Sequence, residues 1–121
     1  EIIRATIEAV AYQTYDLFEA MKHDGLRPKI VKVDGGMVMN DWFSQFLSNV
    51  VNVKVLRPKV QETTAAGAAF MAGLKIGVYK SLKDISKNWR LDRNFSPKMN
   101  SKSRKFLIKG WSLAIKRTLI N

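Results

Sequence analysis

The 121-residue chain contains no cysteine, and this absence removes several kinds of chemistry at once. No disulfide framework, thiolate nucleophile or zinc–thiolate site is possible. The single histidine, His23, belongs to no metal-ligand spacing and has no serine nucleophile pattern beside it. No apolar run approaches the roughly 20 residues that a membrane span needs, and we see no signal peptide. We therefore expect a cytoplasmic protein with no membrane partner and no metal ligands of its own.

Acidic residues are also scarce, with 10 against 21 lysines and arginines, and their placement is uneven. Residues 1–74 carry eight basic and eight acidic residues, whereas residues 75–121 carry thirteen basic residues and only Asp84 and Asp92. Such a basic region can attract nucleic acid or an anionic membrane. The other interpretation is a solvated lysine-rich surface. We favour it, and expect no nucleic-acid partner, because nucleic-acid sites prefer arginine and aromatic groups at defined positions.

The first half of the chain shows alternating helix and strand signals. Apolar residues recur every three to four positions over 2–22, which predicts a helix that ends at Gly25. Short β-branched runs predict strands at 30–33 and 53–56, the second stopped by Arg57 and Pro58. Between them, Asn40 or Asp41 can cap a second helix.

The second half is predicted to be mostly helical. A helix rich in alanine and glycine covers 65–76, and a capping box at Ser81 predicts a short helix through about residue 87. Residues 88–101 read as irregular. The last helix is predicted at 102–119, with an apolar face formed by four residues: Phe106, Trp111, Ile115 and Leu119.

This order of elements indicates an α/β layer structure. Two short strands make a small sheet, which normally has more strands beside it. The chain also opens at Glu1 inside a predicted helix. We therefore interpret it as a piece of a longer protein, with an α/β portion at residues 1–80 and a basic C-terminal extension with a terminal helix at 81–121.

The most informative segment is residues 32–40, Lys-Val-Asp-Gly-Gly-Met-Val-Met-Asn, in which a predicted strand ends at two glycines and a helix follows. Gly35 and Gly36 carry no Cβ, so the backbone can approach a bulky ligand closely. The N–H groups at the start of the next helix suit a phosphate at the same place. This pattern predicts a nucleotide site, although many Asp-Gly-Gly turns only connect two elements.

Asp34 stands at the end of the predicted strand and allows two interpretations. Its carboxylate could contact hydrated magnesium, or it could hydrogen-bond the N–H groups of the turn and have no other role. We favour the structural role.

Four ordered blocks of the sequence resemble one family. The first three are residues 4–14, residues 34–42 with 45–47, and residues 57–58 with 62–69. The fourth is Gly110-Trp111 with residues 114–117. Together they resemble the C-terminal part of the glycerol kinases, in the FGGY family of sugar and polyol kinases. Asp34 before the glycine pair is more similar to glycerol kinases than to xylulose kinases. The resemblance covers essentially residues 1–119.

The resemblance implies a partial actin/hexokinase-like (ribonuclease H-like) ATPase domain, with a small sheet, packed helices and a C-terminal helix. It implies ATP and Mg²⁺ as cofactors and transfer of a phosphoryl group from ATP to glycerol. Gly36 would lie against the ATP phosphates or ribose through its backbone, Asn40 would hydrogen-bond the adenosine, and Gly35 would make the turn possible.

The same resemblance places the family's catalytic aspartate, its glycerol-binding residues and its terminal-phosphate loops upstream of this chain. It therefore implies no catalytic residue here, an inactive fragment, and a homo-oligomer for the intact enzyme. The alternatives are a fragment of another FGGY sugar or polyol kinase, and a basic nucleic-acid-binding module. In some bacterial members of the family, an acidic segment follows a Phe-x-Pro element and docks a regulatory protein. In this chain the element is Phe95-Ser96-Pro97. Here residues 98–105 contain no acid, so we do not expect that regulation.

Overall fold

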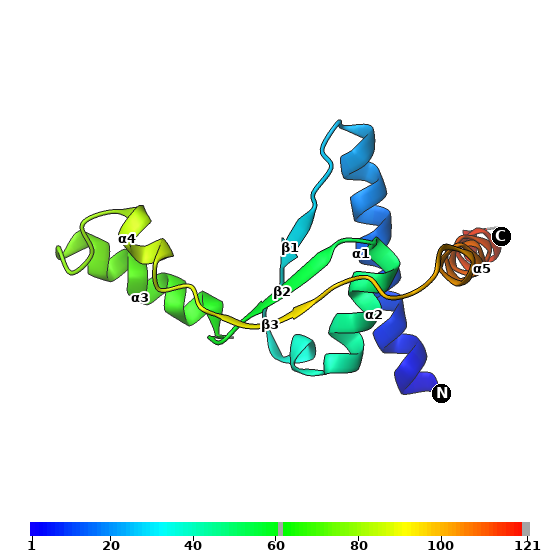
Figure 1. The fold of residues 1–121 in the computed structure, drawn as a ribbon, viewed down its shortest axis with the longest axis horizontal. Coiled ribbons are helices and arrows are strands. Elements are labelled where there is room, and N and C mark those ends of the chain that lie inside the picture. Colours follow the sequence, from blue (N-terminus) through cyan, green and yellow to red (C-terminus); the bar gives the residue numbers. More distant parts are fainter. Residues whose placement is uncertain (61, 120–121) are drawn as a thin grey trace.

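The computed structural model describes residues 1–60 and 62–119. Three strands form one sheet, with α1 and α2 packed on it, while α3 and α4 lie together away from α1, α2 and α5 (Figure 1). The elements in chain order are α1 (Ile2–His23), β1 (Ile30–Lys32), the 3₁₀ helix η1 (Gly36–Met39), α2 (Asp41–Val51), β2 (Lys54–Pro58), α3 (Thr63–Lys75), α4 (Leu82–Ser86), β3 (Leu91–Phe95) and α5 (Ser101–Leu119). No helix in the described part of the chain has the length and apolar character needed to cross a membrane.

The sheet has the order β1-β2-β3, with β2 in the centre. β1 and β2 are parallel, and Val31 pairs with Val55. β2 and β3 are antiparallel, and Val55 also pairs with Phe95. The carboxyl ends of β1 and β2 therefore meet at one edge, where Asp34 and the glycine pair follow β1.

β3 corrects the sequence prediction, which read residues 88–101 as irregular. Its sequence, Leu-Asp-Arg-Asn-Phe, has no alternation of apolar and polar residues, and only Phe95 is buried. Pairing with β2 rather than hydrophobic patterning makes this segment a strand. β2 also extends through Arg57 and Pro58, which were predicted to stop it. Pro58 is tolerated because it lies at the strand's last position, beside a register shift.

The core lies where α1 and α2 meet the sheet. Its buried apolar residues come mainly from α2, with contributions from α1, the loop after β1, β2 and β3: Ala11, Tyr12, Phe18, Val38, Phe43, Phe46, Leu47, Val50, Val51, Val55 and Phe95. Gly25, at φ +84°, ends α1 as predicted, because Leu26 N–H then reaches back to the Met21 carbonyl. This packing fixes α2 beneath the edge of the sheet that carries the glycines.

α5 docks through only part of the predicted face, with Leu107 in contact with the core where Phe106 was predicted. Phe106 is 76% exposed and Leu119 is 78% exposed, whereas Leu107 and Trp111 pack on the core. Leu107 follows Phe106 by one residue, which corresponds to a rotation of about 100° around the helix axis. Trp111 anchors the helix as its position suggested: its ring stacks on Tyr12 with centroids 5.4 Å apart, and its Nε1 donates to Asp16 Oδ2 at 2.7 Å.

Candidate functional site

The glycine loop, residues 34–40, leaves the sheet at the end of β1. Val33 N–H still donates to the Leu56 carbonyl of β2 at 3.0 Å, so the strand pairing continues to the residue before Asp34. Gly35 then adopts φ +88° and ψ 171°, a conformation that essentially only glycine occupies. The predicted helix after the glycines is the single turn η1, and α2 begins at Asp41.

The backbone of the glycine pair is open. A Cβ added at Gly35 or at Gly36 would meet no atom within 4 Å, and Gly36 is exposed. Gly36 itself has no positive φ, so its lack of a side chain is not required by its backbone conformation. A bare stretch of main chain at this point leaves room for a bulky ligand to lie against the peptide groups.

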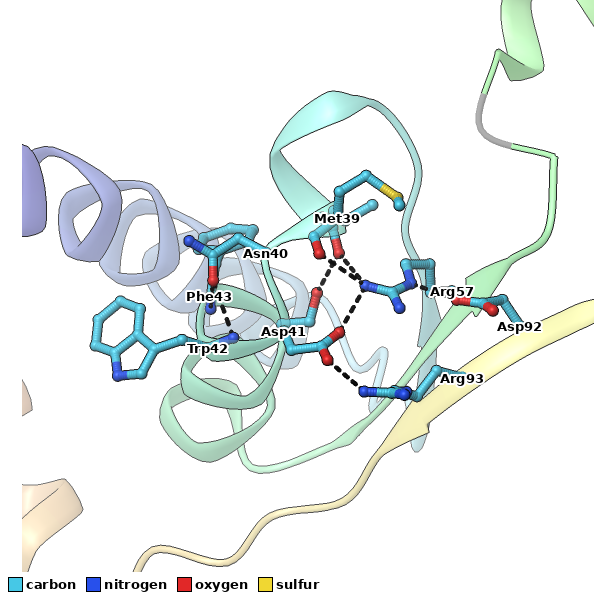
Figure 2. A network of polar contacts seen from close by, with 10 residues as sticks. Met39, Asn40, Asp41, Trp42, Phe43, Arg57, Asp92 and Arg93 are labelled. Carbon is cyan, nitrogen blue, oxygen red and sulfur yellow. Dashed lines mark hydrogen bonds and ion pairs between the residues drawn. The ribbon is translucent and has the colours of Figure 1, made fainter.

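Asn40, one of the two candidates from the sequence, caps α2. Its Oδ1 accepts hydrogen bonds from the backbone N–H of Trp42 at 3.0 Å and of Phe43 at 3.3 Å. Because the oxygen is held by the helix, the amide nitrogen is left on the other side (Figure 2), and within the described residues Nδ2 makes no hydrogen bond. The side chain is exposed and offers an oriented N–H donor beside the glycine loop.

Asp34 connects the strand to the start of α3. Its Oδ2 accepts a hydrogen bond from the Thr63 hydroxyl, and not from the turn's N–H groups as the sequence suggested. Over residues 1–60 and 62–119, no group of three or more His, Cys, Asp or Glu side chains is placed to hold a metal ion. His23 lies at the exposed C-terminal end of α1.

Arg57 is the residue that sequence reasoning missed. It lies in β2, and its side chain is only 6% exposed beneath the glycine loop. Nη1 donates to the Val38 carbonyl at 2.7 Å, to the Met39 carbonyl at 3.2 Å and to Asp41 Oδ1 at 3.0 Å. Nε donates to Asp92 Oδ2 of β3 at 2.7 Å.

Two carboxylates balance this buried charge. Burial alone would lower the pKa of the Arg57 guanidinium, but its hydrogen bonds to Asp92 and Asp41, together with their negative charges, outweigh burial and raise the pKa above its ordinary value. Asp41 also pairs with Arg93 of β3 (Figure 2). The sequence does show a charged residue, Arg57, between Leu56 and Pro58 at the end of a predicted strand, and this is the available signal for a buried charge. It does not indicate which residues would accept its hydrogen bonds.

A cavity of about 290 Å³ lies elsewhere, between α3, α4 and the end of β2. Phe70 and Trp89 form part of its wall, and Lys32 Nζ lies 4.1 Å from the centre of the Trp89 ring. Gly35, Gly36 and Asn40 do not line it. The glycine loop is thus an open wall rather than an enclosed pocket within the described part of the chain.

Comparison with known proteins identifies the family. Residues 1–76 match the C-terminal domain of the FGGY family of carbohydrate kinases. The chain belongs to this family. It is 52% identical over 119 residues to the glycerol kinase of Gluconobacter oxydans (strain 621H), covering 98% of this chain and 23% of that protein. The FGGY prediction from the four sequence blocks is therefore confirmed.

Solved structures confirm the FGGY fold. The crystal structure of Plasmodium falciparum glycerol kinase with ADP matches with a TM-score of 0.82 and 36% identity, over 99% of this chain and 24% of that one. Xylulose kinase from Lactobacillus acidophilus shares the fold, with a TM-score of 0.75 and 24% identity, over 98% of this chain and 24% of that one. The predicted partial actin/hexokinase-like α/β fold is confirmed. The chain spans about a quarter of the length of these relatives.

Proposed function

We propose that this chain forms the nucleotide-binding side of a glycerol kinase, which transfers the terminal phosphoryl group of ATP to glycerol. The observation that carries the proposal is the open main chain at Gly35 and Gly36 beside the oriented amide of Asn40. It occurs in a chain 52% identical to a glycerol kinase and similar to another whose structure was solved with ADP. A backbone without side chains and an adjacent amide donor suit a nucleotide.

Each residue of the glycine loop has a distinct part in this proposal. Gly35 makes the turn, since its φ of +88° is strained for other residues. Gly36 presents its peptide group to the ATP phosphates or ribose. Asn40 donates from Nδ2 to the adenosine, and the α2 cap holds that amide in one orientation.

The remaining parts of the reaction are proposed to lie outside this chain. The described residues offer no cluster of metal ligands, so Mg²⁺ would enter bound to the ATP phosphates. The catalytic base and the glycerol contacts would come from the upstream part of a longer, cytoplasmic and homo-oligomeric enzyme. Within this chain, residues 1–80 would supply the nucleotide wall and residues 81–121 the basic extension, although β3 joins that extension to the sheet.

Substitution of Gly36 by alanine tests the proposal. The new Cβ meets no atom of the described chain and fits the backbone, so the free energy of unfolding should stay within about 0.5 kcal/mol of the parent. The same Cβ would occupy the space of the nucleotide, and we expect ADP to bind at least about tenfold more weakly, the equivalent of one lost contact. Isothermal titration calorimetry with ADP measures this.

Gly110→Ala is the matched control. Gly110 is also exposed with no atom within 4 Å of an added Cβ, but it lies in α5. It should leave ADP affinity unchanged and stabilise the helix by roughly 0.5–1 kcal/mol. The proposal is wrong if the parent chain shows no ADP-dependent NMR shift at Gly35, Gly36 and Asn40, or if Gly36→Ala binds ADP as tightly as Gly110→Ala does.

A further inference from the structure

Arg57 is the only charged side chain among the buried residues of the described chain. Burying a guanidinium is costly unless its donors are all used and its charge is balanced. Here Nη1 and Nε together reach four acceptors within 3.2 Å. The question is what this arrangement achieves at the end of a strand whose neighbours are apolar.

The position of the acceptors answers this. Three of the four belong to residues 38–41, the segment that links Gly36 to α2, and two of these are main-chain carbonyls: those of Val38 and Met39. The Val38 carbonyl also accepts from Ser44 Oγ at 2.9 Å. The segment is therefore held from β2 by Arg57 and from α2 by Ser44, at residues that lie between Gly36 and Asn40 in the sequence. Figure 2 shows Arg57 between Met39, Asp41 and Asp92.

We propose that Arg57 is a positioning residue for the nucleotide: it holds residues 36–40 in the conformation that binds, without itself touching the ligand. The inference rests on the proposed function of the glycine loop. Regular secondary structure does not fix this loop, since η1 is one turn and Gly35 is conformationally free. When the guanidinium is removed, the Met39 carbonyl loses its Arg57 donor and the Val38 carbonyl keeps only Ser44 Oγ. The segment between Gly36 and Asn40 is then held less firmly.

Arg57 could instead have a purely structural role, in which it stabilises the sheet as a whole. A variant of Arg93 distinguishes this role from the positioning role. Arg93 also pairs with Asp41 and lies opposite Arg57 in the β2–β3 register, but it is 56% exposed and donates to no loop carbonyl among the described residues. Substituting either arginine therefore removes an ion pair with Asp41, whereas only substitution of Arg57 also removes the hydrogen bonds to the loop carbonyls.

The test compares Arg57→Lys, Arg57→Met and Arg93→Met in the 121-residue chain. Lysine restores the charge but not the fork of donors, so we expect about a tenfold loss of ADP affinity for Arg57→Lys and about a hundredfold loss for Arg57→Met. Arg93→Met should stay within about threefold, as expected of an exposed pair. Amide hydrogen exchange at Asn40, whose N–H donates to the Met37 carbonyl at 3.2 Å, should accelerate in the Arg57 variants while exchange in the core of α1 stays slow.

Two outcomes overturn the inference: unchanged exchange in the glycine loop of a folded Arg57→Met, or equal losses for Arg93→Met and Arg57→Met. If Arg57→Met does not fold, Arg57→Met/Asp92→Asn removes the unbalanced carboxylate of β3 and takes its place. If the parent chain binds no ADP, the proposed function fails. The exchange measurement still decides whether Arg57 holds the loop, since it needs no nucleotide.

Discussion

At the scale of single residues, the helix cap that Asn40 provides and the adenosine contact proposed for it can be separated by mutation. Serine caps a helix about as well as asparagine, so Asn40→Ser should keep the hydrogen bonds to Trp42 and Phe43 and leave the free energy of unfolding within about 0.5 kcal/mol. It lacks the amide donor, and we expect about tenfold weaker ADP binding. Calorimetry with ADP and urea denaturation measure the two quantities.

Asn40→Ala provides the comparison. It loses both the cap and the donor, and should cost about 1 kcal/mol in stability in addition to the binding loss. If Asn40→Ser bound ADP as well as the parent chain while Asn40→Ala did not, the helix cap and not the amide would be what the nucleotide requires.

Tyr12 should titrate at an unusually high pH for a tyrosine. Its burial, followed by the charge of Glu8 and the hydrogen bond to Glu8, raises its pKa to about 12, although Arg4 opposes the shift. Below pH 10 the hydroxyl is protonated in both states. Between pH 10 and 12 the unfolded chain releases this proton first, so the free energy of unfolding falls as the pH rises.

The absorbance of tyrosinate, recorded as a function of pH, measures the Tyr12 titration directly. Tyr12→Phe should remove the ionisation near pH 12 and flatten the loss of stability across the same pH range. A titration in which no tyrosine ionises near pH 12 would contradict the burial of this hydroxyl between α1 and α5.

At the scale of the elements, the sequence predicts those whose signal is local. The helix signal of α1, a cap at Asn40 or Asp41 and a helix end at Gly25 all depend on neighbours in the chain. The structure confirms the helix, has Asn40 as the cap and ends α1 at Gly25. β3 is a strand because β2 lies beside it, and its own residues give no indication of this. Arg57 was missed for the same reason, since its acceptors come from three separate segments.

The docking of α5 gives the prediction at this scale. Trp111 is half-buried, stacks on Tyr12 and donates to Asp16. Trp111→Ala should lower the free energy of unfolding by about 2–3 kcal/mol, less than for a fully buried tryptophan. Phe106 was predicted to pack on the core but is exposed, so Phe106→Ala should change the free energy of unfolding by less than about 0.5 kcal/mol. Thermal denaturation measures the stability of both variants. If Phe106→Ala were less stable than Trp111→Ala, the observed docking face of α5 would be contradicted.

At the scale of the whole molecule, we propose that the chain presents one wall of a nucleotide site. Phosphoryl transfer depends on positioning ATP, metal and acceptor hydroxyl together, and the described residues supply no metal cluster and no enclosed pocket at Gly36. We expect the 121-residue chain alone to produce no glycerol 3-phosphate from glycerol and Mg-ATP in a coupled assay. A full-length relative, such as the Gluconobacter enzyme, is the positive control. Turnover by the chain near that of the control would contradict the proposal that the catalytic base and the glycerol contacts lie outside this chain.

The contact between Arg57 and Asp92 also has a consequence for biosynthesis. The family match ends at Ile76, before β3 begins, yet one of the two carboxylates that balance the guanidinium belongs to β3. On the ribosome, the glycine loop emerges long before Asp92 does, because synthesis runs from the N-terminus. The complete set of Arg57 contacts, with both carboxylates in place, can therefore form only after β3 has been translated and has paired with β2.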